Sequence, residues 1–239
     1  MRLDFGYGTG VQTVDIPDGN LLGVLTANEI QHELGGEAAV RAALAAPIGA
    51  KRLRDVVKPG QKIAIIASDI SRPVPSYEIL PAILDELTAA GCRDEDVTVV
   101  FALGSHRHHT EAEKRKLAGD AVYDRVRCED SDPDDCVHLG TTHAGTPVDI
   151  TRRVAEADFH ICTGNIEFHY FAGYSGGAKA IMPGVSTPAA IQANHRMMVS
   201  ESACAGRLDG NPIRADIEEA GRICGADYIV NVVLDEHKH

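Results

Sequence analysis

Tryptophan is absent from this chain, and aromatic residues make up only 5% of its 239 positions. No apolar run approaches the roughly 20 residues that a membrane-spanning helix needs. The N-terminus begins Met-Arg-Leu-Asp-Phe-Gly and lacks the apolar segment and cleavage site of a signal peptide. These absences predict a cytoplasmic protein that does not enter a membrane.

Basic charge is also in short supply. The chain has 23 lysines and arginines against 35 acidic residues, so its formal net charge is −12. Such a field repels nucleic acid and anionic membrane surfaces, and no basic block offsets it locally. We therefore expect neither nucleic acid nor a membrane as a partner. The hydrophobic content of 44% is typical of a globular chain.

Paired cysteine motifs are missing as well. The six cysteines are scattered through the chain with no CxxC spacing, which is typical of reduced, partly buried thiols in the cytoplasm. A thiolate metal site is the alternative. The cysteines are Cys92, Cys128, Cys136, Cys162, Cys204 and Cys224.

Short apolar runs alternate with helical patterns along most of the chain. This alternation predicts an α/β fold with an open, mostly parallel, Rossmann-like sheet and helices on both faces. We expect residues 1–239 to form a single domain of this kind. The expected strands are 62–67, 97–103, 122–128, 136–139, 159–163 and 226–234, with one or two more in 1–20. The expected helices are 36–57 with a break near Pro47, 76–90, 110–118, 188–199 and 212–224.

Three loops follow the carboxyl ends of expected core strands. They span residues 68–75, 104–110 and 164–179, and each contains unusual polar residues. In open parallel sheets this edge is where ligands bind. The sequence therefore predicts that the three loops meet at one site.

The third loop belongs to a glycine-rich stretch from Gly164 to Gly184. Its glycines allow tight turns that expose backbone N–H groups to an anion, and Lys179 follows where a short helix could begin. The stretch is not a Walker A loop, because Ala178 precedes the lysine and Ala180 stands where that motif needs serine or threonine. A purely structural glycine-rich turn is the alternative.

The other two loops carry candidate binding and catalytic side chains. Asp69 could accept hydrogen bonds from ribose hydroxyls, and Arg72 could hold a phosphate through its planar guanidinium. The alternative is a local Asp–Arg ion pair that stabilises the loop and binds no ligand. His106 is expected to point into the crevice as a proton acceptor. His108 and His109 are expected to be solvated at the start of the following helix.

Four motifs resemble those of one known family. They are SDxxRPxP at 68–75, GxHRxxT at 104–110, NxExHYFAGYSGGAKAIMPGV at 165–185 and AxxxNH at 190–195. Their order and content resemble the N-terminal half of the nickel-dependent lactate racemase family. The resemblance covers most of residues 1–235, and the third motif is long and specific.

The resemblance implies a cofactor and a role for each matching residue. Members of the family use nickel held in a pincer complex by a pyridinium-3,5-dithio-type mononucleotide. By resemblance, Lys179 is the lysine that tethers this nucleotide and His195 is the protein ligand of nickel. His106 and His169 are the catalytic acid and base on opposite faces of the substrate. The nucleotide would be bound by Asp69, Arg72, Tyr174, Ser175, Gly176 and Gly177.

The implied reaction is racemisation or epimerisation of a small 2-hydroxy acid by proton-coupled hydride transfer, an isomerase activity. Cofactor-synthesis proteins are implied partners. Members of the family also have a second domain that closes the cleft, so a C-terminal domain or a second chain is expected. Two alternatives stay open. One is a non-catalytic domain that binds a cofactor or nucleotide, and the other is a zinc hydrolase built on His106, His108 and His169.

Overall fold

The computed structural model describes residues 1–26 and 33–235, and the chain divides into two compact units, Met1–Glu33 and Leu34–His239. The smaller unit is an antiparallel hairpin of β1 (Arg2–Tyr7) and β2 (Gly10–Asp15), followed by the 3₁₀ turn η1 (Asp18–Asn20). The strands expected within residues 1–20 are thus confirmed.

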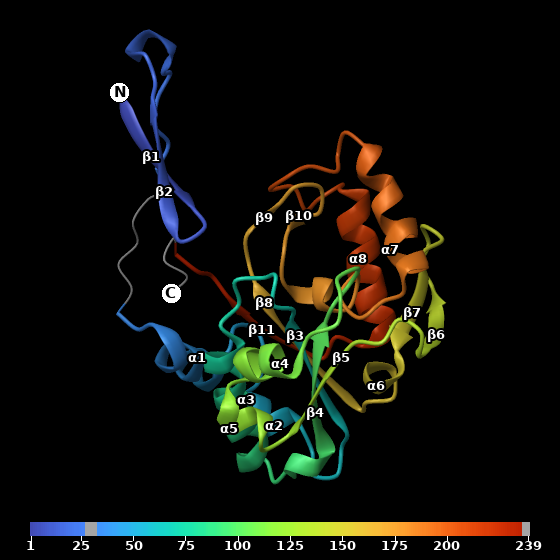
Figure 1. Ribbon diagram of the computed structural model, residues 1–239. Coiled ribbons are helices and arrows are strands. Elements are labelled where there is room, and N and C mark those ends of the chain that lie inside the picture. The colour runs from blue at the N-terminus through green and yellow to red at the C-terminus, as the bar shows by residue number, and fades with distance from the viewer. Residues whose placement is uncertain (27–32, 236–239) are drawn as a thin grey trace. The chain divides into compact units, whose positions relative to one another are not determined.

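A five-stranded parallel sheet is the centre of the larger unit (Figure 1). Its spatial order is β11-β8-β3-β4-β5, and every neighbouring pair is parallel. The expected α/β class is confirmed. The strands are β3 (Ile63–Ser68), β4 (Val97–Ala102), β5 (Arg127–Asp130), β8 (Phe159–Asn165) and β11 (Tyr228–Val232).

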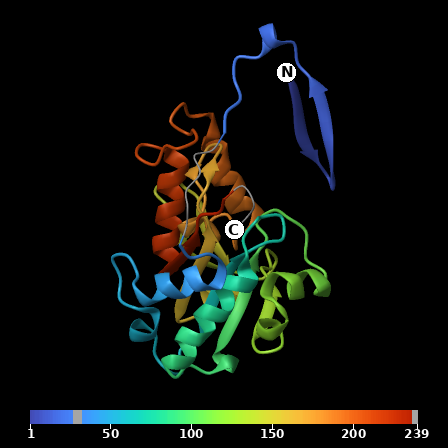
Figure 2. The ribbon, with the colours of Figure 1, turned by 90° about the vertical axis from the view of Figure 1, so that its left-hand side faces the viewer.

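Helices cover both faces of this sheet because successive strand side chains point in opposite directions. Ile65 and Phe101 pack in a core with α1 (Gly36–Ala45) and α3 (Ser76–Ala89). On the opposite face, buried residues such as Ile66 pack in a second core with α7 and α8. Figures 1 and 2 show these two helical layers on either side of the strands. α7 spans Pro188–His195 and α8 spans Pro212–Cys224.

Shorter elements connect these layers. The helices are α2 (Leu53–Val56), α4 (Glu111–Ala118), α5 (Asp120–Tyr123) and α6 (Arg152–Ala155). Two antiparallel hairpins pair β6 (Cys136–Thr141) with β7 (Pro147–Thr151), and β9 (Phe168–His169) with β10 (Gly173–Tyr174). The 3₁₀ turns are η2 (Asp94–Asp96), η3 (Gly177–Ala180) and η4 (Arg196–Val199).

Helix ends follow local sequence signals closely. Thr110 and Glu113 form a capping box at the start of α4, in which each side chain accepts a hydrogen bond from the other residue's backbone N–H. Asn211 caps α8 through the N–H groups of Ile213 and Arg214, and a proline occupies the first helical position. The helices expected over 110–118 and 212–224 are confirmed.

One expected strand starts later than predicted. Residues 120–123 form α5 rather than the start of the strand expected over 122–128, since Gly119 adopts φ 77° and begins a new helical turn. The helix expected over 36–57 is interrupted near Pro47 as predicted, with Ile48 fully exposed between α1 and α2. Pro81 lies in the second turn of α3, whose tight packing on the sheet outweighs the missing N–H. The short helix expected at Lys179 is the single 3₁₀ turn η3, because Pro183 follows.

A buried carboxylate ties α3 to the segment around α2. Glu86 is 5% exposed and accepts hydrogen bonds from Arg52 (2.8 Å) and from Nε of Arg54 (2.9 Å). Hydrogen bonds from Arg54, the largest cause, and from Arg52 lower the pKa of Glu86 to about 2. The ionised form of Glu86 therefore stabilises the folded chain.

Glu86→Gln is expected to lower the free energy of unfolding by about 2 kcal/mol at pH 7, since bonds to a charged group are lost. The folded pKa lies below the unfolded value. The contribution is therefore present above about pH 4.5 and is lost as the pH falls toward 2. Urea unfolding at several pH values measures both effects.

The control is the neighbouring residue Asp85, whose side chain is 53% exposed and pairs with Arg41 on the surface. Asp85→Asn is expected to cost no more than about 0.5 kcal/mol. Equal losses for the two variants would contradict the role given to Glu86.

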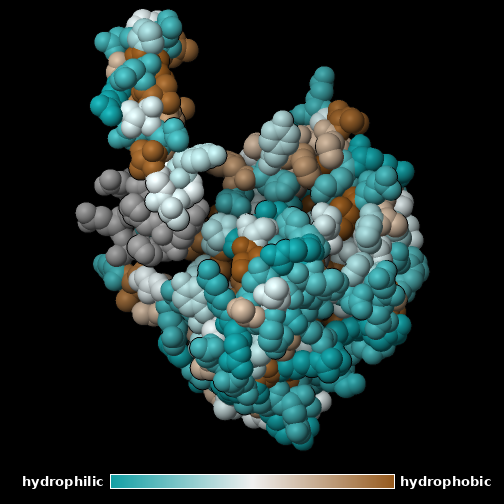
Figure 3. Space-filling model, viewed as in Figure 1, coloured by the Kyte–Doolittle hydropathy of each residue, from teal (hydrophilic) through white to brown (hydrophobic). Residues whose placement is uncertain are grey.

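The surface of the larger unit is mostly hydrophilic on the face drawn in Figure 3, with apolar side chains in small patches. None of the helices in residues 1–26 and 33–235 is long and apolar enough to cross a membrane. All six cysteines are free thiols, and Cys92, Cys162 and Cys224 are buried. Free, partly buried cysteines are as expected from their spacing.

Candidate functional site

The site lies where the strand order of the parallel sheet reverses. Numbered by appearance in the chain, the five strands lie in the order 3-2-1-4-5, so the reversal falls between β3 and β8. Ligands bind at such switch points, beyond the carboxyl ends of the strands. A cavity at this place is lined by the loops after β3, β4 and β8 and by α7. The three loops therefore meet as predicted.

Most of the candidate residues line this one cavity. Those on its wall are Asp69, Arg72, His106, His169, Ser175, Gly176, Lys179 and His195. Tyr174 and Gly177 do not line it. The Tyr174 ring stacks on Phe168 with 5.3 Å between centroids, and its carbonyl accepts a hydrogen bond from Arg214. Gly177 is buried and donates its N–H to Asn231.

Lys179 is half-buried and has no counter-ion among the residues that the structure describes. It lies in η3 behind the glycine-rich loop, and no carboxylate in the described residues forms a salt bridge with it. Burial, followed by the positive charges of Arg72 and Arg214, lowers the pKa of Lys179 to about 8. A substantial fraction of this amine is therefore neutral near pH 7.5, as a nucleophile must be.

Arg72→Met is expected to raise the pKa of Lys179, because one of the two neighbouring cations is removed. The measurement is the pH dependence of acylation at Lys179, quantified by peptide mass. Arg107→Met is the matched control, since Arg107 is in the neighbouring loop and pairs with Glu113 on the surface. An unchanged acylation profile in Arg72→Met would refute the electrostatic explanation.

His169 faces the cavity from the β9–β10 hairpin. Its Nδ1 accepts a hydrogen bond from the N–H of Ala172 at 3.2 Å, so the neutral ring carries its proton on Nε2. Burial, followed by the charge of Lys179, lowers the pKa of His169 to about 4. The Phe171 ring makes edge contacts with both His169 and His195, with 4.7 Å and 4.9 Å between ring centroids. Phe171 therefore lies against both imidazoles.

The hydrogen bonds at His106 favour a ring proton on Nδ1, whereas those at His169 favour one on Nε2. Its Nδ1 lies 2.9 Å from Oδ2 of Asp69 and 3.2 Å from Oγ of Ser71. Asp69 is buried, and its carboxylate also accepts hydrogen bonds from Ser71. A carboxylate at Nδ1 places the ring proton there, so Nε2 of His106 is left as a proton acceptor.

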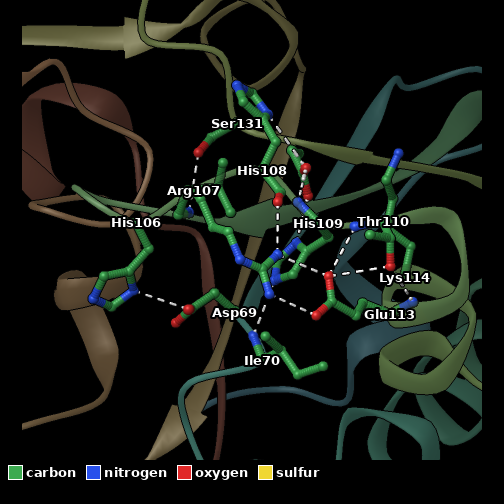
Figure 4. Close-up of polar contacts among 12 residues, drawn as sticks. Asp69, Ile70, His106, Arg107, His108, His109, Thr110, Glu113, Lys114 and Ser131 are labelled. Carbon is green, nitrogen blue, oxygen red and sulfur yellow. Dashed lines mark hydrogen bonds and ion pairs between the residues drawn. The ribbon is translucent and has the colours of Figure 1, made fainter.

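His109 is buried rather than solvated, so that expectation is wrong. Its Nδ1 lies 2.6 Å from Asp130 at the end of β5, and its Nε2 accepts the N–H of Ile70 at 3.1 Å. Figure 4 shows this ring between the two loops, while His106 turns toward Asp69. His109 thus pins the loop that contains Asp69 to the loop that contains His106. His108 is exposed, as expected, and does not line the cavity.

Close backbone contacts shape the glycine-rich wall. Gly176 has φ 76°, and a Cβ there would lie 2.9 Å from the side-chain amide nitrogen (Nδ2) of Asn231 on β11. A Cβ on Gly164 would lie 3.2 Å from the Cα of Gly176. Ser175 donates its hydroxyl to the carbonyl of Asn165. Larger residues at the two glycines would push this wall away from the end of the sheet.

His195 is the last residue of α7. Its Nδ1 lies 3.2 Å from Oδ1 of Asn194, and the ring lines the cavity. Burial, followed by the charge of Lys179, lowers the pKa of His195, although a hydrogen bond to the backbone of Ile191 opposes this. A neutral imidazole is the form that binds a metal.

Some residues of the site lay outside the sequence prediction. Asn165 and Glu167 line the cavity, and Oδ1 of Asn165 is buried without a hydrogen-bond partner in the described part of the chain. Both belong to the NxExH motif, which was a usable signal. Arg214, from α8, acts on Lys179 through its charge. Arg72 and Lys179, two lining cations without salt bridges in the described residues, suit the phosphate of a nucleotide, and the unpaired Oδ1 of Asn165 can accept a hydrogen bond from a ligand.

This chain is similar to proteins named lactate racemase. A family profile described as the lactate racemase N-terminal domain matches residues 7–206. A lactate racemase from Thermoanaerobacterium thermosaccharolyticum is 35% identical over 99% of this chain and 57% of its own length. One from Lactiplantibacillus plantarum is 34% identical over 100% of this chain and 58% of its own length.

Solved structures give the same result. The lactate racemase apoprotein from T. thermosaccharolyticum superposes with a TM-score of 0.87 at 34% identity, covering 100% of this chain and 57% of that one. A Thermotoga maritima protein at 22% identity shares the fold, with a TM-score of 0.65 over 84% of this chain and 51% of its own. This chain thus spans a little over half the length of the curated relatives, and it belongs to the lactate racemase family, as a match to its N-terminal domain.

Proposed function

We propose that this chain is the cofactor-bearing domain of a racemase or epimerase that acts on a small, lactate-like 2-hydroxy acid. The observation that carries the proposal is the convergence of His106, His169, Lys179 and His195 on one cavity at the switch point of the sheet. The two relatives named lactate racemase support the substrate class.

The proposed cofactor is nickel held by a pyridinium-3,5-dithio-type mononucleotide. Lys179 would form the covalent tether, and its partly neutral amine suits that reaction. His195 would supply a neutral imidazole to nickel, a donor that this metal accepts readily. When bound, the group would accept a hydride from C2 of the substrate and return it.

The nucleotide part would lie against the glycine-rich wall. Arg72 has no salt-bridge partner in the described residues and is free to hold a phosphate. Ser175 and Gly176 line the same wall. Asp69 would contribute to nucleotide binding and also orient His106. Tyr174 and Gly177 would act through the shape of the loop, since neither lines the cavity.

The two histidines would move the hydroxyl proton. His106 presents an unprotonated Nε2, and neutral His169 presents Nε2–H, so the site holds a proton acceptor and a hydrogen-bond donor at the same time. The two enantiomers would present their hydroxyls to different sides of the cavity, so the hydroxyl proton would be taken up on one side and supplied on the other. One histidine per face meets that requirement.

Other partners belong to the same proposal. A C-terminal domain or second chain would close the cleft and contact the substrate, and cofactor-synthesis proteins would load Lys179. The free cysteines are compatible with a cytoplasmic location. A cofactor- or nucleotide-binding domain without turnover is the second candidate, because the chain matches only part of its relatives. A zinc hydrolase is less well supported, since His108 lies outside the cavity.

The test is to produce the chain together with cofactor-synthesis proteins and to measure its intact mass and nickel content. We expect one nucleotide adduct and one nickel per chain, with the adduct mapped to Lys179. No adduct and no nickel under these conditions would refute the proposal. Binding of cofactor without exchange of hydrogen at C2, when a C-terminal domain is supplied, would favour the non-catalytic alternative.

A further inference from the structure

Behind His195 lies a buried polar network that none of the expected site residues explains. Asn194 is 0% exposed, and Asp216 on α8 is 2% exposed. The Asn194 side-chain amide donates to Oδ2 of Asp216 at 2.7 Å and to the carbonyl of Ile213 at 3.3 Å. Burying a carboxylate costs free energy unless its oxygens are hydrogen-bonded, so Asp216 needs the donors that surround it.

Asp216 is fully engaged by donors. Thr142 donates to Oδ1, and Thr146 donates to Oδ2 at 2.8 Å. Both threonines come from the β6–β7 turn, and both are buried. The carboxylate is therefore fixed in place, and its Oδ2 can serve only as an acceptor for Asn194.

The amide orientation of Asn194 follows from these partners. Its NH₂ group faces two acceptors, Asp216 and the carbonyl of Ile213, so the opposite atom, Oδ1, must be the one that faces His195. Oδ1 lies 3.2 Å from Nδ1 of His195. An oxygen acceptor at Nδ1 requires a hydrogen on that nitrogen, which leaves the lone pair on Nε2.

We propose that Asn194, fixed by Asp216, is a positioning residue that holds His195 in the Nδ1–H tautomer and so makes Nε2 the metal-binding atom. The metal-binding part rests on the proposed function. Neighbours of this kind set the tautomer and orientation of metal-binding histidines in many proteins. Here the acceptor is an amide, which is itself oriented by a buried carboxylate.

The first test needs no cofactor. In the ¹⁵N-labelled chain at neutral pH, long-range ¹H–¹⁵N spectra are expected to show His195 as the Nδ1–H tautomer. In Asn194→Leu, which has similar volume and no acceptor, the Nε2–H population is expected to rise to a detectable level. Thr142→Val is the matched control, because it alters the same network without touching Asn194, and it should keep the wild-type tautomer.

A wild-type Nε2–H tautomer would overturn the inference, and this measurement does not depend on how any variant folds. An unchanged tautomer in Asn194→Leu would also overturn it, because the backbone of Ile191 would then suffice to fix the ring.

The second test uses protein loaded with nickel. We expect Asn194→Leu to lose nickel to a chelator about 10- to 100-fold faster than the wild type. Equal loss would overturn the metal-binding part of the inference. Failure of the wild type to take up nickel at all would instead refute the proposed function, and the cofactor-free spectra distinguish the two cases.

Discussion

Replacing Lys179 by alanine is expected to abolish cofactor attachment. The variant should show no mass addition, no retained nickel and racemisation at the level of protein without cofactor. Lys179 lines the cavity with a half-buried amine whose lowered pKa leaves it free to react, and no other lysine in residues 1–26 and 33–235 lines that wall. The measurements are intact mass, metal content and interconversion of enantiomers by the protein joined to the C-terminal domain.

Lys179→Arg separates the proposed covalent role of this residue from its charge. Arginine keeps the positive charge but cannot supply an amine for the tether, so it should fail as completely as alanine. Lys62→Ala is the control, because Lys62 is an exposed lysine that lines a different cavity, and it should load normally. Full racemase activity in either Lys179 variant would exclude the tether.

Removing the charge of Lys179 should also change its neighbour. Lys179 is the second cause, after burial, of the lowered pKa of His169. In Lys179→Ala the pKa of His169 is therefore expected to rise from about 4, while it should stay low in Lys179→Arg. A tethered Lys179 would also raise the pKa of His169, as the alanine does, because an amide-type nitrogen carries no charge. Loading the cofactor would thus make His169 a better proton acceptor.

The core strands were predictable because they are short, apolar and buried on both faces. Residues 63–68 and 97–102 lie between clear turn signals, and their burial depends on composition more than on any particular partner. The caps at Thr110 and Asn211 were predictable for a related reason, since each is a contact within three residues. Strands and caps of this kind depend on residues that are close together in the sequence.

Features that depend on distant partners were not predictable from the chain alone. His109 looks like a surface histidine until Asp130, from another strand, is placed beside it. Asn194 contacts Asp216, which is on a different helix. The run around Val122 has strand-like residues, but Gly119 and packing on the core select a helical turn. The long motif around Lys179 located the site, whereas the orientation of each side chain required the fold.

Single replacements of the two histidines proposed to be catalytic are expected to have opposite effects on the two enantiomers. His106→Ala and His169→Ala should each lower racemisation by about 10²- to 10⁴-fold, the usual contribution of a positioned acid or base. Adduct and nickel should remain, because neither residue is proposed to bind them. Each variant keeps one histidine, so each should still convert one enantiomer to the 2-oxo acid, and the enantiomer should differ between them. Trapping the 2-oxo acid with a hydrazine measures this directly.

His108→Ala is the control for this pair, because His108 shares the loop of His106 but points away from the cavity and is exposed. It should leave both enantiomers unaffected. If both variants lost the same enantiomer, the histidines would not act on opposite faces. If either variant racemised normally, water or another residue would carry the proton, and the complementary hydrogen bonds at Asp69 and Ala172 would have a structural role only.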